Sequence, residues 1–204
     1  NEATFRGQDY GNLNWFNTYP SNDLLDEYEA GDKRFAGSFY VVGDTYNNGN
    51  NTTTVDNFKA SGNTRRAAWK KYQNYYKQTD EQQESGINFK IIRWADVLLM
   101  KAECENEVGS RATAINYINE VRTRSGLAGV PSTAIKADVF QAIVHERKVE
   151  LAGEQVRFDD ILRWGISDTA LKGTNFIKGK SELWPIPDKV YSTNPNIGAQ
   201  NPGY

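Results

Sequence analysis

Apolar residues recur every three to four positions through the second half of the chain, and this period predicts amphipathic helices. The predicted helices run from about 91 to 108, from the cap Ser110 to about 125, from Pro131-Ser132 to about 152 and from about 156 to 164. Ile91, Ala95, Leu98, Leu99 and Ala102 form the apolar stripe of the first one. Glycines follow the first, second and fourth helices, where they end the helical pattern.

The first 88 residues follow another pattern, with many Asn, Gly, Thr and aromatic residues between short apolar runs. Ser21 or Asn22 can cap one helix there, and Gly31 ends it. The run 35–42 predicts a short strand, because aromatic and β-branched residues favour strands. The segment 47–51 predicts a loop, since Asn and Gly tolerate positive φ angles.

These elements together predict a mainly α fold. The short connection between the first two of the four helices predicts an antiparallel hairpin, and a second hairpin follows near the tetratricopeptide period. We therefore expect tetratricopeptide-like helix hairpins over 89–204, preceded by a loop-rich, ligand-facing subdomain over 1–88. The Pro-rich segment from Glu182 to Tyr204 predicts an extended strap that packs back over helices.

Composition and charge exclude several classes of function. The 204 residues include 24 Lys and Arg against 26 Asp and Glu, and the net charge of −2 gives no sign of a nucleic-acid-binding surface. Cys104 is the single cysteine, so an internal disulfide is impossible. No apolar run approaches the length of a membrane span.

Catalytic and metal-binding chemistry finds little support. The single histidine, His145, lies in the string His-Glu-Arg-Lys-Val, which lacks the second histidine of a zinc-binding HExxH motif. Glu103 and Glu107 share a helix face, as a glycosidase pair could, but 26 acidic residues make such pairs frequent by chance. No Gly-rich phosphate loop occurs. We therefore expect no catalytic residue, no metal site and no cofactor.

Arg147 falls on the apolar stripe of the third predicted helix, where a buried cation needs a partner. Glu150 and Glu154 follow along the same stretch, and Arg157 comes at its end. This spacing favours a structural ion network that fixes the third helix against the fourth over a catalytic role.

The ligand-binding hypothesis depends on aromatic rings that lie among amides in the first 88 residues. Flat rings stack on the apolar faces of sugars, and amides hydrogen-bond to hydroxyls. The predicted ligand-binding residues are Trp15, Tyr19, Tyr40, Tyr46 and Trp69. The alternative for any single ring is that it packs in the core of a small subdomain, because aromatic side chains bury well.

Five segments, in order, resemble the SusD/RagB family of outer-membrane nutrient-binding proteins. They read YPSNDLLDEYEAGDKR from residue 19, IRWADVLLMKAE from 92, AINYINEVRTRS from 114, HERKVELAGEQVRFDDILRWG from 145, and LWPIP from 183 with QNPGY at the end. One departure is Gly153-Glu154-Gln155, where the family commonly shows Phe-Glu-Gly.

The resemblance implies a binding protein without catalytic residues, held at the outer-membrane surface by a lipidated N-terminus that this sequence lacks. Such proteins capture oligosaccharides, or peptides in some cases, and deliver them to a SusC-like TonB-dependent transporter. Family members are considerably longer, so we expect this chain to be the C-terminal part of one. Peptide binding, and a docking role without ligand contact, remain alternatives to glycan binding.

Overall fold

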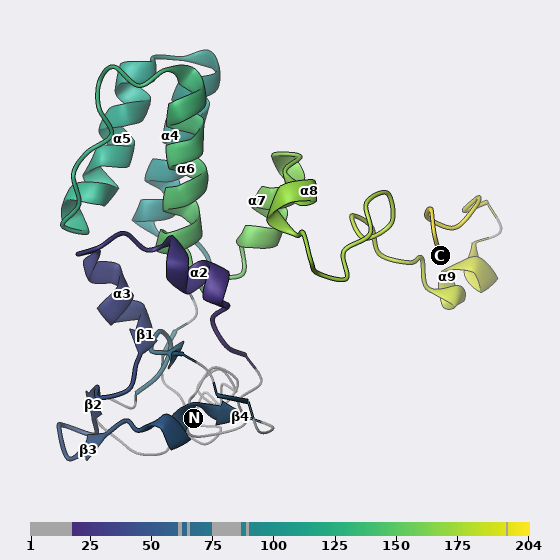
Figure 1. The fold of residues 1–204 in the computed structure, drawn as a ribbon. Helices are drawn as coiled ribbons and strands as arrows, with labels where there is room; N and C mark the ends of the chain where they lie inside the picture. The colour runs from purple at the N-terminus through teal and green to yellow at the C-terminus, as the bar shows by residue number, and fades with distance from the viewer. Residues whose placement is uncertain (1–17, 61–62, 65, 75–86, 89, 195) are drawn as a thin grey trace. The chain divides into compact units, whose positions relative to one another are not determined.

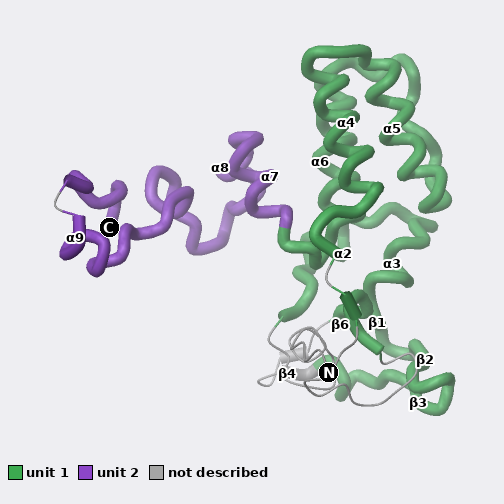
Figure 2. The backbone as a smooth tube through the Cα atoms, turned by 180° about the vertical axis from the view of Figure 1, so that it is seen from behind, with its two compact units in different colours: residues 1–155 green, residues 156–204 purple. Residues whose placement is uncertain are grey.

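The computed structural model describes residues 18–60, 63–64, 66–74, 87–88, 90–194 and 196–204. Residues 1–155 and 156–204 form two compact units (Figure 2). The first unit contains segments from both sides of residue 88, and the predicted subdomain boundary there stays a prediction. In the described part of the chain the structure is mainly helical, as the apolar period predicts.

Three long helices form a bundle in the first unit, namely α4 (Trp94–Val108), α5 (Arg111–Arg124) and α6 (Lys136–Glu150). They lie side by side and each contacts the other two (Figure 1). The buried residues between them include Leu98, Leu99, Ile118, Val121, Val139 and Ile143. The sequence places these helices correctly to within a few residues. The placement of Ile91 on the apolar stripe of the first helix is wrong, because α4 begins only at Trp94 and the Ile91 side chain is 80% exposed.

Two short helices and a strand pair lie near one end of this bundle (Figure 1). Helix α2 (Asn22–Glu27) contacts α6. The amide of Leu24 donates to the Ser21 hydroxyl at 3.1 Å, so Ser21 is the cap of the two predicted candidates, Ser21 and Asn22. Helix α3 (Lys33–Ser38) follows. Strand β1 (Phe39–Tyr40) pairs antiparallel with β6 (Ala68–Trp69).

The strand predicted over residues 35–42 is mostly wrong. Its first four residues complete α3, because the Asp32 carboxylate caps that helix by accepting from the amide of Arg34 at 2.9 Å. Extended pairing is confined to β1, where β6 supplies a partner. A local cap therefore overrides the aromatic and β-branched composition of this segment.

The predicted loop over 47–51 is confirmed as the turn of a hairpin between β2 (Thr45–Tyr46) and β3 (Asn51–Thr52). Asn47, Asn48 and Gly49 all have positive φ angles, of 52°, 54° and 84°. Beyond it come a single 3₁₀ turn (Val55–Phe58) and the pair β4 (Lys59–Ala60) and β5 (Asn63–Thr64).

The second unit holds α7 (Arg157–Arg163), α8 (Ser167–Ala170) and α9 (Asp188–Thr193). The helix at 157–163 is as predicted. Because α6 and α7 fall in different units, the tetratricopeptide-like pairing of the third and fourth predicted helices stays a prediction, as does the packing of the strap. Among the residues that the structure describes, no helix combines the length and apolar character needed to cross a bilayer.

Candidate functional site

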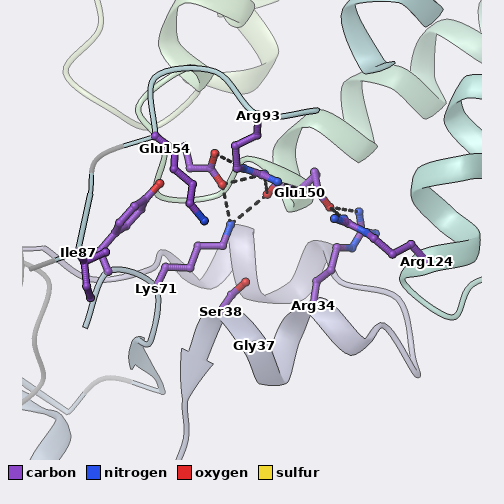
Figure 3. A pocket seen from close by; sticks show the side chains of 11 residues that line it. Arg34, Gly37, Ser38, Lys71, Ile87, Arg93, Arg124, Glu150 and Glu154 are labelled. Atoms are coloured by element: carbon purple, nitrogen blue, oxygen red, sulfur yellow. Dashed lines mark hydrogen bonds and ion pairs between the residues drawn. The ribbon is translucent and has the colours of Figure 1, made fainter. Parts of the chain in front are cut away.

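A pocket of about 410 Å³ lies within the first unit, and we call it the charged pocket. It is lined by Arg34, Gly37, Ser38, Lys71, Tyr72, Ile87, Lys90, Arg93, Arg124, Glu150 and Glu154 (Figure 3). These residues come from α3, from the segment after β6, from the approach to α4, and from the C-terminal ends of α5 and α6. Its volume falls within the range of about 300–1,000 Å³ that is usual for small-molecule sites.

Glu150 lies at the centre of the charges in this pocket, between Arg93 on one side and Arg34 and Arg124 on the other (Figure 3). Its carboxylate lies 2.9 Å from Arg93, 3.3 Å from Arg34 and 2.5 Å from Arg124. Burial alone would raise the pKa of Glu150, but the hydrogen bonds and charges of Arg124 and Arg93 lower it below its usual value. Glu150 is therefore ionised at neutral pH.

Glu154, just past the end of α6, binds Arg93 as well and one further cation, Lys71. Its carboxylate lies 2.7 Å from Nε of Arg93 and 3.0 Å from Nζ of Lys71. The Lys71 ammonium also donates to the backbone carbonyls of Glu150 and Ala152, each at 3.0 Å. Burial lowers the pKa of Lys71, and the Glu154 carboxylate opposes that effect. These contacts fix the turn after α6 against the β6 segment.

A second layer of ion pairs lies behind the pocket wall. Arg34 binds Asp32 and Glu146, each at 2.7 Å, and the fully buried Glu146 also binds Arg122 at 2.5 Å. The predicted partner for Arg147 exists as Asp96 on α4, at 2.7 Å. An ion network around α6 therefore exists, but it joins this helix to α3, α4 and α5, and the predicted link from the third helix to the fourth stays a prediction.

The predicted ligand-binding rings occupy other places. Tyr40, Tyr46 and Trp69 are 1%, 9% and 4% exposed, so their side chains pack inside the first unit. Tyr40 and Tyr46 share a cluster with Phe58 and Ala68. The remaining two are Tyr19, which is half-buried, and Trp15, which lies outside the described residues. Packing explains the three buried rings, while ligand contact by any of the five stays a prediction.

One group of side chains has the donor types of a metal site. Single ligand atoms of Glu29, His145 and Glu146 lie within 4.8 Å of one another. The guanidinium of Arg122 already lies 2.7 Å from Glu29 and 2.5 Å from Glu146, so these carboxylates have a positive partner. His145 Nδ1 lies 2.6 Å from Glu27 on α2. This arrangement suits a structural link between α2 and α6 better than a metal ion.

The second unit has an aromatic hollow of about 400 Å³, which the sequence reasoning missed. Its rings are Phe158, Phe176, Trp184 and Tyr204, and the Trp184 side chain is 85% exposed. Phe158 and Phe176 meet edge to face with their centroids 6.3 Å apart. Such a surface offers apolar area and few charges, in contrast to the charged pocket.

The charged pocket was also missed, although the sequence contains a signal for it. Arg34, Arg93, Arg124, Glu150 and Glu154 each fall inside a segment that resembles the SusD/RagB family. Each is a charged residue close to an apolar stripe or a helix end. Such residues are candidates for buried ion pairs, but their spacing along the chain does not show that they meet.

Comparison with known proteins matches residues 4–179 to the SusD family. SusD-like protein P25 of Formosa agariphila is 36% identical in an alignment of 132 residues that covers 56% of this chain and 24% of that protein. A SusD superfamily protein from Bacteroides vulgatus, solved as a crystal structure, is 29% identical with a TM-score of 0.82 over 99% of this chain and 48% of its own. A solved laminarin-binding SusD-like protein is 29% identical with a TM-score of 0.64, over 100% of this chain and 42% of its own.

The chain thus spans about half the length, or less, of the relatives it matches. The family match covers most of its residues, and the fold of the Bacteroides vulgatus protein extends over nearly all of them. The five segments that resemble the SusD/RagB family lie mostly inside the matched range. On this evidence of sequence and fold, the chain belongs to the SusD family.

Proposed function

We propose that this chain binds oligosaccharides at the bacterial cell surface, without chemical conversion, for delivery to a TonB-dependent transporter of the outer membrane. The observation that carries this proposal is membership of the SusD family, together with likeness over the whole chain to a protein described as laminarin-binding. The charged pocket supplies a place for such a ligand. Arginine and carboxylate side chains there converge with the half-buried Tyr72 and Ile87.

The chemistry of this pocket suits sugar recognition. Sugar hydroxyls both donate and accept hydrogen bonds, so they pair with guanidinium groups and with carboxylates alike. The ring of Tyr72 and the side chain of Ile87 offer apolar surface on which a pyranose face can lie. A few convergent polar groups beside apolar surface are typical of small-molecule sites.

The same pocket is poorly suited to glycoside hydrolysis. That reaction needs one carboxylic acid that is protonated at neutral pH and a second carboxylate that is ionised. Glu150 has a lowered pKa, and Glu154 is paired with Arg93 and Lys71. Neither carboxylate is prepared to act as a general acid, so we assign the pocket to binding.

Titration of the chain with laminari-oligosaccharides, other plant and host glycans and short peptides, followed by tryptophan fluorescence and calorimetry, tests the proposal. We expect saturable binding of one glycan class. A Tyr72→Ala variant should weaken that binding about tenfold or more, because a stacked ring and its desolvated face are lost. Tyr19→Ala is the comparison variant, since it removes a predicted ring that does not line the charged pocket.

The variants separate the competing assignments. A loss of affinity in Tyr19→Ala alone would move the site from the charged pocket to the surroundings of Tyr19. A Trp184→Phe variant removes the exposed indole of the aromatic hollow, so a fluorescence change that disappears with it would place the ligand there. Binding of peptides alone, or of nothing by a folded chain, would overturn glycan binding in favour of the peptide-binding or docking alternative.

A further inference from the structure

The charged pocket has more cations than recognition of a neutral sugar requires. Five cationic side chains line it against two carboxylates, and two more carboxylates, Asp32 and Glu146, pair with Arg34 behind the wall. A formal excess of one positive charge remains, whereas the whole chain carries −2. The cations are Arg34, Lys71, Lys90, Arg93 and Arg124. An excess of one sign inside a concave site attracts ligands of the other sign, because low-dielectric walls concentrate the field.

Three of these cations are already occupied by the protein. Arg34 is held by Asp32 and Glu146 behind the wall as well as by Glu150. Arg93 donates hydrogen bonds to Glu150 and Glu154 through all three of its side-chain nitrogens. Lys71 has three acceptors, namely Glu154 and two backbone carbonyls. These three side chains set the local field but have little left to give a ligand.

Arg124 and Lys90 retain donors for a ligand. The Arg124 side chain is 54% exposed, and among the described residues it forms one hydrogen bond, from Nη2 to Glu150. A guanidinium carries five N–H donors, so most of its donors remain available. Lys90 is exposed and has no ion pair within the described part of the chain. Lys90 lines the pocket without holding it together, whereas Arg124 also binds Glu150 and still keeps donors for a ligand.

This distribution of charge favours one class of ligand. We infer that the charged pocket takes an acidic sugar, with Arg124 and Lys90 binding a carboxylate or sulfate group on a pyranose ring that lies against Tyr72. The planar guanidinium can bind either oxyanion through two parallel hydrogen bonds, and the ammonium adds a second positive charge. This inference rests on the proposed glycan binding and narrows its substrate class.

The nearby carboxylates do not forbid an anion. Glu150 is paired with Arg34, Arg93 and Arg124, so its negative charge is already balanced. Its lowered pKa agrees with a positive surrounding field, since burial alone would raise that pKa. Glu154 is likewise held by two cations. An incoming anion therefore meets an excess of positive charge.

Calorimetric titration of the full chain with matched ligand pairs tests the inference. One pair is a galacturonate oligosaccharide and its methyl ester, which differ in the charge of the carboxyl group. The other is a sulfated galactan oligosaccharide and its desulfated form. We expect one acidic member to bind about tenfold or more tightly than its neutral partner, with a preference that weakens as salt rises from low to high.

The variant that decides the assignment is Lys90→Gln, because Lys90 is exposed and its loss leaves the internal ion pairs intact. It should remove most of the preference for the acidic sugar, because the affinity for the acidic member falls more than the affinity for its neutral partner. Arg124→Gln should do the same, and its stability is checked separately since it also loses the bond to Glu150. Lys189→Gln, the same change at an exposed site on α9, should have no effect.

The outcomes distinguish this inference from the proposed function. Equal affinity for acidic and neutral members, or a preference that survives Lys90→Gln and Arg124→Gln, would overturn the acidic-sugar assignment while glycan binding stands. Failure of every glycan to bind the folded chain would overturn both. Tighter binding of the acidic member in only one of the two pairs would support the inference and show whether the anionic group is a carboxylate or a sulfate.

Discussion

Single carboxylates on α6 hold several segments of the first unit together. Glu150 meets arginines from α3, from the approach to α4 and from α5. Glu146, one turn earlier on α6, has no exposed surface and binds Arg34 and Arg122. A buried ion costs free energy to desolvate, and that cost is offset only while its partners remain in place. Removal of one such charge should therefore leave an excess of positive charge among its buried partners.

Glu146→Gln tests this at the most buried carboxylate. We expect a loss of about 3–5 kcal/mol in the free energy of unfolding, because Arg34 and Arg122 would each lose a charged partner inside the fold. Urea unfolding followed by circular dichroism measures it. Glu107→Gln makes the same chemical change in an exposed pair with Lys136, and it should cost less than about 1 kcal/mol. Equal losses in the two variants would refute the structural role of the buried network.

At the scale of elements, the turn after α6 connects that helix to the charged pocket. Gly153 has a φ of 77°, and a Cβ built there would lie 3.0 Å from the ring of Trp69 in β6. The turn thus needs glycine both for its left-handed backbone and for the close approach of β6. It lies in the Gly-Glu-Gln string where the sequence departs from the pattern of its family, and it positions Glu154 in the pocket.

Gly153→Ala should therefore destabilise the chain by about 1–2 kcal/mol from backbone strain alone. The matched change Gly37→Ala lies inside α3, where a Cβ meets nothing within 4 Å and φ is ordinary. It should raise the stability by about 0.5–1 kcal/mol, since alanine favours helix. Thermal unfolding of both variants provides the measurement. A neutral or stabilising effect of Gly153→Ala would show that the turn does not require glycine.

At the scale of the whole molecule, the described carboxylates with lowered pKa values lie in the first unit. Interactions with cations lower the pKa values of Glu27, Glu29 and Glu150 below 4.5. For Glu27 and Glu150, burial is the largest single influence and raises the pKa, but the interactions with cations together outweigh it. For Glu29, the largest influence is the hydrogen bond from Arg122, which lowers the pKa. A carboxylate with a lower pKa in the folded state than in the unfolded state stabilises the fold only when it is ionised.

The stability of the chain should consequently be nearly constant above about pH 5.5 and fall steadily as the pH drops below about 4.5. Protonation then removes charges that Lys148, Arg122 and Arg124 need. Urea midpoints measured from pH 7 to pH 3 provide the test. The loss should be smaller in a Glu150→Gln variant, which starts less stable but has one fewer group to protonate. A midpoint that rises on acidification would contradict the sign of these shifts.

The sequence alone determined the helices and their caps, because the information needed is local. The apolar period fixed α4, α5 and α6 to within a few residues, and Ser21 and Ser110 were found as caps. The mainly α fold and the SusD family followed from the same segments. Where a local cap competed with composition, as Asp32 does at α3, the sequence reasoning gave the wrong element.

Only the tertiary structure decided which of these residues make a site. Arg34 and Glu150 are separated by 116 positions, so no spacing rule predicts that they meet. Burial likewise depends on which segments pack over a side chain. The sequence therefore did not show that Tyr40 and Trp69, predicted as ligand contacts, lie in the core. The sequence shows which side chains are charged or aromatic, whereas the packing of the folded chain decides which of them lie close together.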